Sequence, residues 1–244
     1  MKKEESCPYA RIKRSIQHAY LKEEGIEKYV AMHASPYPEI VRTLKRGSIC
    51  NYTVWLWENE LYDYWEAIPD SGIPQICVSE IEEERVAERA AWDRWRAQIR
   101  PCFLGHQEGV YYDTLFELAH IDGERSFAVY RAADEMKGSA VKRRVLCARL
   151  RAEKKDEFCR LAGGGLAALS DALCAHHVGN LSVSLLGDDV YVYFEYGGDA
   201  YEDDMARLLE NENFAAWKRA AEDCMLVREE GGLYKEFQEI FCCE

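Results

Sequence analysis

Residues 51–66, NYTVWLWENELYDYWE, recur in altered form as residues 180–195, NLSVSLLGDDVYVYFE. The two stretches align without a gap, and random pairing at ordinary residue frequencies would give about one identical pair. The identical pairs are Asn51/Asn180, Val54/Val183, Leu56/Leu185, Tyr62/Tyr191, Tyr64/Tyr193 and Glu66/Glu195. We interpret the recurrence as an internal duplication, in which differences between the copies separate residues needed for the fold from residues needed for chemistry.

Each copy has the pattern of a β-hairpin, at 49–68 and 180–196, and similar elements flank both hairpins. The first half predicts a strand near residues 16–20, helical stretches at 25–33 and 39–45 separated by prolines, a helix at 81–99 and a strand within 110–121. The second half predicts a strand at 145–150, a helix at 153–175, a helix at 202–223 and a strand at 233–241. Gly163, Gly164 and Gly165 lie inside the first of these helices and predict a break, because glycine disfavours a helix interior.

These elements define the predicted domains: a repeat at 11–121, a linker at 122–143 and a second repeat at 144–244. Each repeat has the β-α-β-β-α-β order of a ferredoxin-like α+β fold. Helices would cover one face of each sheet, and the free faces of two repeats can pack together into an intramolecular dimeric α+β barrel. We expect the strand face that carries Tyr52, Val54 and Leu56 to line the interior of that barrel.

Composition narrows the range of functions. The chain has 244 residues and a net charge of -13, which argues against a nucleic-acid partner because phosphate binding needs clustered Lys and Arg. No apolar run resembles a secretory signal or a membrane span, so we expect a cytoplasmic protein without a membrane partner. The ten cysteines form no CxxC pair, and we expect mostly reduced thiols and no metal site.

A small group of polar and aromatic residues in the first repeat is suited to chemistry. Tyr29 and His33 are four residues apart on a predicted helix and therefore share one face. Tyr52 on the hairpin can converge with them, and Trp92 on the second helix can supply a flat apolar wall. The second repeat has Phe158, Ala162 and Leu181 where the first has Tyr29, His33 and Tyr52, so only the first repeat retains titratable groups.

The spacing Tyr29-x3-His33-x4-Pro38-Glu39, followed by Leu44, Asn51-Tyr52, Trp92 and Pro101, resembles the L-rhamnose mutarotase family. The resemblance covers about residues 16–101 and extends weakly over the second repeat. It implies that His33 is the proton donor and that Tyr29, Tyr52 and Trp92 contact the sugar. Asp93 stands where the family has a second tryptophan, Trp95 is one helical turn along, and Glu39 can hold a hydroxyl or start a helix.

The resemblance implies a mutarotase-like isomerase that interconverts the anomers of a small aldose, such as L-rhamnose or another 6-deoxyhexose. Histidine suits this reaction because its ordinary pKa lies near working pH, and the reaction needs no metal or organic cofactor. Two alternatives remain open: a non-catalytic sugar-binding or regulatory module, and a monooxygenase or haem-handling protein of the same barrel superfamily. The assembly expected is a monomer with an internal pseudo-dimer, or a homodimer.

Overall fold

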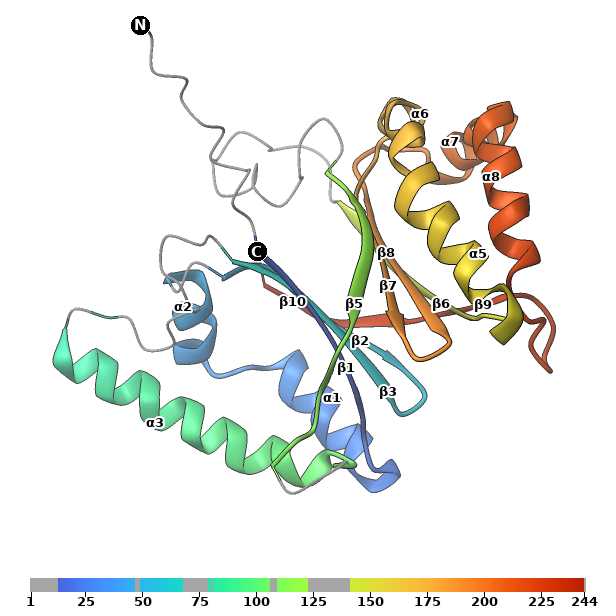
Figure 1. Ribbon diagram of the computed structural model, residues 1–244. Coiled ribbons are helices and arrows are strands. Elements are labelled where there is room, and N and C mark those ends of the chain that lie inside the picture. The colour runs from blue at the N-terminus through green and yellow to red at the C-terminus, as the bar shows by residue number, and fades with distance from the viewer. Residues whose placement is uncertain are drawn as a thin grey trace, which may run out of the picture. The chain divides into compact units, whose positions relative to one another are not determined.

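The protein is described by a computed structural model, which covers residues 13–46, 49–67, 79, 81–105, 109–122 and 141–243. The chain divides into two compact units, each with a five-stranded sheet and its own helices (Figure 1). Unit 1 comprises Met1–Tyr112 with Ile240–Glu244, and unit 2 comprises Asp113–Glu239. The repeat boundaries 11–121 and 144–244 concern the duplication and stay a prediction, and most of the predicted linker lies outside the described residues.

Unit 1 contains a sheet with the strand order β10-β2-β3-β1-β4. The strands of this sheet are β1 (Lys13–Tyr20), β2 (Ile49–Trp57), β3 (Glu60–Ala67), β4 (Asp113–Thr114) and β10 (Gln238–Cys243). Of these, β4 and the first two residues of β10 fall within the chain segment assigned to unit 2. The helices of unit 1 are α1 (Ile26–Ala34), α2 (Pro38–Arg46) and α3 (Glu82–Ile99), and they gather on one side of β1–β3 (Figure 1). Helix α1 ends before the two prolines, and α2 begins at Pro38, where a missing backbone N–H costs nothing.

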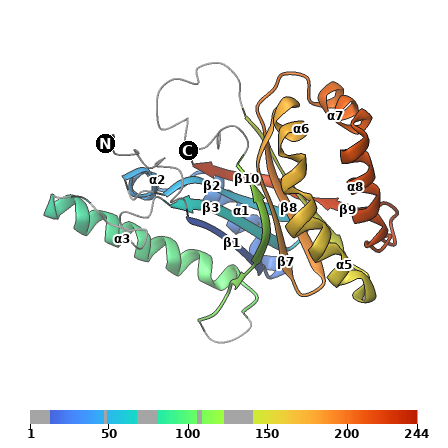
Figure 2. The ribbon, with the colours of Figure 1, turned by 45° about the horizontal axis from the view of Figure 1, so that its top comes forward.

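Unit 2 contains a sheet with the strand order β5-β7-β8-β6-β9. Its strands are β5 (Phe116–Ile121), β6 (Lys142–Arg149), β7 (Val178–Leu186), β8 (Asp189–Tyr196) and β9 (Tyr234–Glu236). Its helices are α5 (Lys155–Arg160), α6 (Ser170–Ala175), α7 (Tyr201–Glu210) and α8 (Glu212–Asp223), which the turned view places beside β7 and β8 (Figure 2). The predicted break at the glycines is confirmed, because Leu161–Gly165 forms a π-helical turn between α5 and α6.

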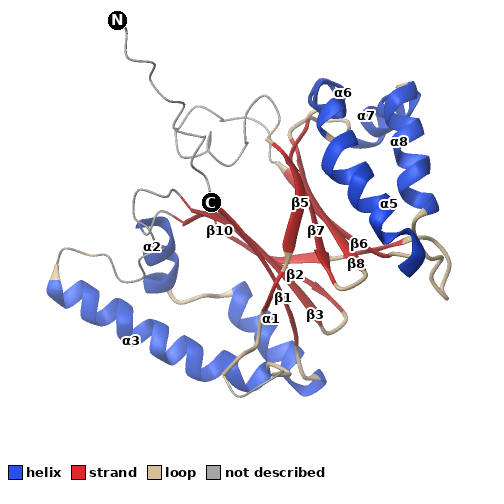
Figure 3. Ribbon diagram, in the orientation of Figure 1, coloured by secondary structure: helices blue, strands red, loops and turns tan. Residues whose placement is uncertain are grey.

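The observed elements confirm the α+β class with two ferredoxin-like repeats (Figure 3). The closing of the two sheets into one barrel stays a prediction. Three predicted elements are divided in the structure. The strand expected within 110–121 forms β4 and β5, which belong to different sheets. The helix expected at 202–223 breaks at Asn211, whose side chain caps α8 by accepting a hydrogen bond from the Phe214 N–H at 3.1 Å. The strand expected at 233–241 divides into β9 and β10, which belong to different sheets.

The residues that are identical in both hairpins serve the fold. The bounds of β1, β2 and β3 recur, displaced by one constant number of residues, as β6, β7 and β8. Asn51 and Asn180 are both buried, and both have a positive φ, 52° and 43°, where the ladder changes register. Tyr64 donates to Glu66 at 2.7 Å, and the same contact recurs between their counterparts in β8. These shared polar residues are therefore explained by structure alone.

Two further sequence expectations concern membranes and thiols. Within the described part of the chain, no single helix is long and apolar enough to cross a membrane. One pair of helices, Ala152–Gly165 and Ala167–Ala175, has the length and composition for a span when taken together, but the pair is bent by 45°. Among the described residues, Cys102, Cys159, Cys174 and Cys224 are free thiols.

Candidate functional site

A cavity of about 240 Å³ lies in unit 1 among residues of α1, β2, α3 and the segments 100–103 and 111–112. It is lined by Tyr29, His33, Tyr52, Trp92, Trp95, Arg96, Ile99, Arg100, Phe103, Tyr111 and Tyr112. The sequence placed the strand face of Tyr52 in a barrel interior, and that expectation is wrong. The face with Val54 instead packs against Tyr29 of α1 and Ile99 of α3, because these helices carry the apolar side chains that cover it.

Tyr29 and His33 lie together in the cavity wall, as their spacing on one helix face predicted. They are 1% and 5% exposed, and their ring centroids are 4.2 Å apart at a tilt of 30°. The imidazole also packs in T-shaped geometry with Trp95 and Phe241, and the distances between ring centroids are 5.1 Å and 5.7 Å. His33 is therefore held in one orientation by aromatic rings on several sides.

The backbone fixes the tautomer of His33. Its Nδ1 lies 2.9 Å from the carbonyl oxygen of Tyr29, and a carbonyl can only accept, so Nδ1 carries the proton. In the neutral ring Nε2 then holds a lone pair. Burial lowers the pKa of His33 from 6.5 to about 4, against the smaller opposite effect of the hydrogen bond to Tyr29. At neutral pH the imidazole is therefore an uncharged proton acceptor.

Asp63, on β3 opposite Val54, is a second titratable group at this site, and the sequence analysis did not identify it. The residue is 2% exposed, and its Oδ1 has no donor at hydrogen-bond distance among the described residues. Burial raises the pKa of the Asp63 carboxyl from 3.8 to about 7, and hydrogen bonds with Tyr112 and Tyr52 partly oppose that rise. Asp63 thus holds its proton up to about neutral pH.

Three tyrosines connect Asp63 to the cavity. Tyr52 and Tyr112 hydrogen-bond with the carboxyl group and also line the cavity. Tyr29 hydrogen-bonds with Tyr112, so the contacts run in sequence from Tyr29 to Tyr112 to Asp63. Burial is the largest cause that raises the pKa of each tyrosine well above 10, so all three remain neutral hydroxyls.

The tryptophan positions on α3 differ from the pattern that the family resemblance implies. Trp92 lines the cavity, and its indole N–H has no acceptor among the described residues. Asp93, which stands at the expected second tryptophan, points to solvent with 70% of its side chain exposed and pairs with Arg96 at 3.9 Å. Trp95 is 6% exposed and lines the cavity beside His33, because it follows Trp92 by nearly one helical turn.

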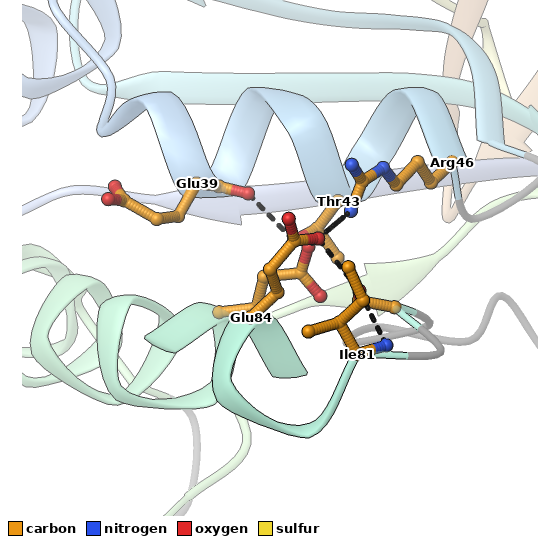
Figure 4. Close-up of polar contacts among 7 residues, drawn as sticks. Glu39, Thr43, Arg46, Ile81 and Glu84 are labelled. Atoms are coloured by element: carbon orange, nitrogen blue, oxygen red, sulfur yellow. Dashed lines mark hydrogen bonds and ion pairs between the residues drawn. The ribbon is translucent and has the colours of Figure 1, made fainter. Parts of the chain in front are cut away.

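Glu39 lies outside the cavity, at the first turn of α2, where its acidic side chain suits the helix N-terminus. Its backbone carbonyl accepts from the Thr43 hydroxyl at 2.7 Å, and its carboxylate points away from the nearby polar contacts (Figure 4). These contacts join α2 to α3, since Arg46 donates to Glu84 at 2.8 Å and lies 3.4 Å from the fully buried Glu88. They orient the helix that carries Trp92 and Trp95.

A comparison of the two hairpins could have identified Asp63. In the gapless alignment, Asp63 corresponds to Val192, a charged residue against an apolar one at a strand position. No comparable signal marked Tyr112, Phe103 or Arg100, because they follow α3 in an irregular segment whose path is set by tertiary packing. The described residues contain no group of three or more His, Cys, Asp or Glu side chains arranged to hold a metal ion.

The fold and the site define an α+β protein with a ferredoxin-like unit that contains an aromatic cavity, in which one imidazole lines the wall and one buried carboxyl group lies behind two tyrosines of that wall. Residues 14–118 match the family model of L-rhamnose mutarotase, so the resemblance to that family is confirmed over this segment. The roles of individual residues stay a prediction.

Solved structures share the fold over nearly the whole chain. A candidate monooxygenase from Lactobacillus acidophilus NCFM aligns with a TM-score of 0.51 at 6% identity, over 96% of both chains. Another, from Fusobacterium nucleatum subsp. nucleatum, aligns with a TM-score of 0.51 at 9% identity, over 96% of this chain and 92% of that one. At such identities the likeness concerns the fold alone. The comparison with curated proteins finds no match.

Proposed function

We propose that unit 1 binds a small aldose in its aromatic cavity and interconverts the α and β anomers, with one active site per chain. The observation that carries the proposal is the convergence of Tyr29, His33, Tyr52 and Trp92 on one cavity, within the segment that matches the L-rhamnose mutarotase family. The cavity, about 240 Å³, is smaller than the ~300–1,000 Å³ pockets that hold drug-sized ligands, and it suits a monosaccharide.

In this proposal His33 is the base of ring opening. Its Nε2 takes the proton of the anomeric hydroxyl, the anomeric C–O bond becomes a carbonyl, and the bond between C1 and the ring oxygen breaks. The pKa of about 4 makes the imidazolium a ready donor, so the same group returns the proton when the ring closes. Family resemblance implies a proton donor at this position, and microscopic reversibility gives His33 both roles in turn.

The ring oxygen needs a proton as the ring opens, and Asp63 supplies it through a tyrosine. When Asp63 is protonated it donates to the Tyr52 oxygen, which frees the Tyr52 O–H to donate into the cavity. Proton transfer from Tyr52 to the ring oxygen is then balanced by transfer from Asp63 to Tyr52. The open-chain aldehyde rotates about C1–C2, and the reverse steps close the ring on either face.

The two pKa values predict the pH range of activity. The mechanism requires a neutral His33, present above about pH 4, and a protonated Asp63, present below about pH 7. The rate of anomer exchange should therefore follow a bell-shaped profile between these limits. Trp92 supports sugar binding, because its ring offers an apolar face to the C–H face of a pyranose and its unpaired indole N–H can donate to a hydroxyl.

NMR saturation exchange between the anomers of L-rhamnose and L-fucose tests the proposal with full-length protein. Wild type should accelerate exchange, and His33→Ala should lose at least tenfold of that acceleration. His176→Ala is the matched control, because Nδ1 of His176 makes the same contact with a carbonyl four residues earlier, at 2.8 Å, but outside the cavity. If the anomers exchange at the same rate with and without the wild-type protein, the proposal of catalysis is refuted. Saturable sugar binding without exchange would then identify a binding module, and a Soret absorption band would identify a haem-handling protein.

A further inference from the structure

Unit 2 contains a cavity of about 160 Å³, and its lining shares no residue with the lining of the unit 1 cavity. It lies among residues of α5, α6, α7, α8 and the sheet. Its lining is Leu146, Phe158, Leu166, Leu173, Val178, Leu181, Val183, Val192, Phe194, Met205, Leu208, Phe214, Trp217, Lys218, Ala221, Met225 and Tyr234. Aliphatic and aromatic side chains thus make up nearly all of its wall.

The polar groups of this wall are largely engaged with protein partners. Trp217 donates its indole N–H to the Leu161 carbonyl at 2.9 Å, so the cavity faces the carbon atoms of the ring. Lys218, the only charged residue of the lining, pairs with Glu222 one turn along α8. Besides Lys218, the Tyr234 hydroxyl is the remaining polar side-chain group of this lining, so the wall offers few of the two to four polar partners that a buried water needs. The cavity is therefore suited to a molecule without hydrogen-bonding groups over most of its surface.

The π-helical turn (Leu161–Gly165) packs against Trp217 of the cavity wall. Ala162 of this turn is fully buried and stands where unit 1 has His33, so this position carries no imidazole ring. Gly165 allows Trp217 to approach closely, since a Cβ at Gly165 would lie 3.1 Å from Trp217 Cδ1. Such turns inside helices occur frequently at functional sites.

The positions that make the unit 1 cavity polar are apolar here. Phe158, Leu181 and Val192 line this cavity and correspond to Tyr29, Tyr52 and Asp63 in the gapless alignment of the repeats. The replaced hydroxyl and carboxyl groups leave nothing to hold a sugar. Both units therefore have a cavity, but the wall in unit 2 is apolar at the positions where the wall in unit 1 is polar.

We infer that unit 2 binds a small apolar molecule of the size of a single aromatic ring. Size and lining select this class: an engineered protein cavity of ~150 Å³ lined by Leu, Ile and Phe stays dry and binds benzene or xenon. The cavity of unit 2 has about the same volume and the same kind of lining. The inference does not depend on the function proposed for unit 1.

Xenon and benzene are the probes for the experiment, with full-length protein. The ¹²⁹Xe NMR shift should show saturable binding, and benzene should displace the xenon while L-rhamnose should not. Ala221→Leu adds a side chain into the cavity and should weaken benzene binding at least tenfold. Ala216→Leu is the matched control, because it adds the same side chain on the exposed face of the same helix and should leave binding unchanged.

Three outcomes would overturn the inference. They are a xenon shift that does not saturate, displacement of xenon by L-rhamnose, and equal benzene affinity in wild type and in a folded Ala221→Leu variant. If Ala221→Leu does not fold, as judged by circular dichroism, the competition between xenon, benzene and L-rhamnose in wild type still decides, because it needs no variant. Failure here leaves anomer exchange in unit 1 untouched, so the two proposals can fail separately.

Discussion

Asp63 and His33 should act in opposite directions on the pH dependence of stability. The pKa of Asp63 is raised from 3.8 to about 7 in the folded state. The folded state thus keeps a proton that the unfolded chain releases, and the free energy of unfolding falls as pH rises from 3.8 to 7. The pKa of His33 is lowered from 6.5 to about 4, so its contribution to the free energy of unfolding is present above pH 6.5 and is lost as pH falls to 4.

The size of each effect follows from the shifts, at about 1.4 kcal/mol per pKa unit. Asp63 lowers the free energy of unfolding by about 4 kcal/mol above pH 7, and His33 lowers it by about 3 kcal/mol below pH 4. Between pH 4 and 6.5 the two slopes nearly cancel in wild type. Asp63→Asn removes one slope while keeping the shape of the side chain. The difference in unfolding free energy between this variant and wild type should therefore grow by about 4 kcal/mol from pH 4 to pH 8.

Urea unfolding in steps from pH 4 to pH 8, followed by tryptophan fluorescence, measures this difference. Five of the six tryptophans belong to unit 1, so the signal reports on the unit that holds Asp63. His33→Gln should no longer lose free energy of unfolding as pH falls from 6.5 to 4. The free energy of unfolding of His176→Gln should follow that of wild type at every pH. If Asp63→Asn and wild type differ by the same amount at every pH, then Asp63 ionises normally in the folded state and the reasoning fails.

Three further substitutions give independent tests. Tyr52→Phe removes a hydrogen bond that stabilises ionised Asp63, so the carboxyl pKa should rise further, which ¹³C NMR titration of the labelled side chain measures. Asp93→Trp restores the residue that the family resemblance implies. The variant should change the anomer exchange rate less than twofold, because position 93 faces solvent. A tenfold gain would show that the new side chain reaches the sugar. Asn180→Ala should lower the free energy of unfolding, measured by calorimetry, by about 2–3 kcal/mol. The variant loses the 2.9 Å hydrogen bond to Glu195 and places alanine at a positive φ. An unchanged unfolding transition would contradict the structural role of Asn180.

The local elements could be predicted because they depend on short-range patterns. Alternation and tight turns located both hairpins, and the i,i+4 spacing placed Tyr29 and His33 together on one face. The glycines at 163–165 predicted a break, and the break is a π-helical turn. The capping residue Asn211 also offered a local signal for the division of the last helix.

Long-range features could not be predicted in the same way. A strand pattern does not reveal which sheet edge a strand will join, so the assignment of β9 and β10 to different sheets had no signal in residues 233–241. The face of Tyr52 was assigned to the wrong side for a related reason. Both faces of the hairpin carry apolar residues, and only the packing of Tyr29 and Ile99 decides which face the helices cover.

The cavity of unit 2 bears on how the two units differ in chemistry. An apolar space of about 160 Å³ that side chains leave unfilled lowers stability, and a larger side chain at Ala221, which lines the space, is a short route to removing it. Unit 2 instead combines this space with apolar residues at 158, 181 and 192, where unit 1 has Tyr29, Tyr52 and Asp63. A mere loss of chemistry gives no reason for an open space with a matched apolar wall. An occupant offsets this loss, since a ligand that binds only the folded state raises stability in proportion to the logarithm of its concentration relative to Kd.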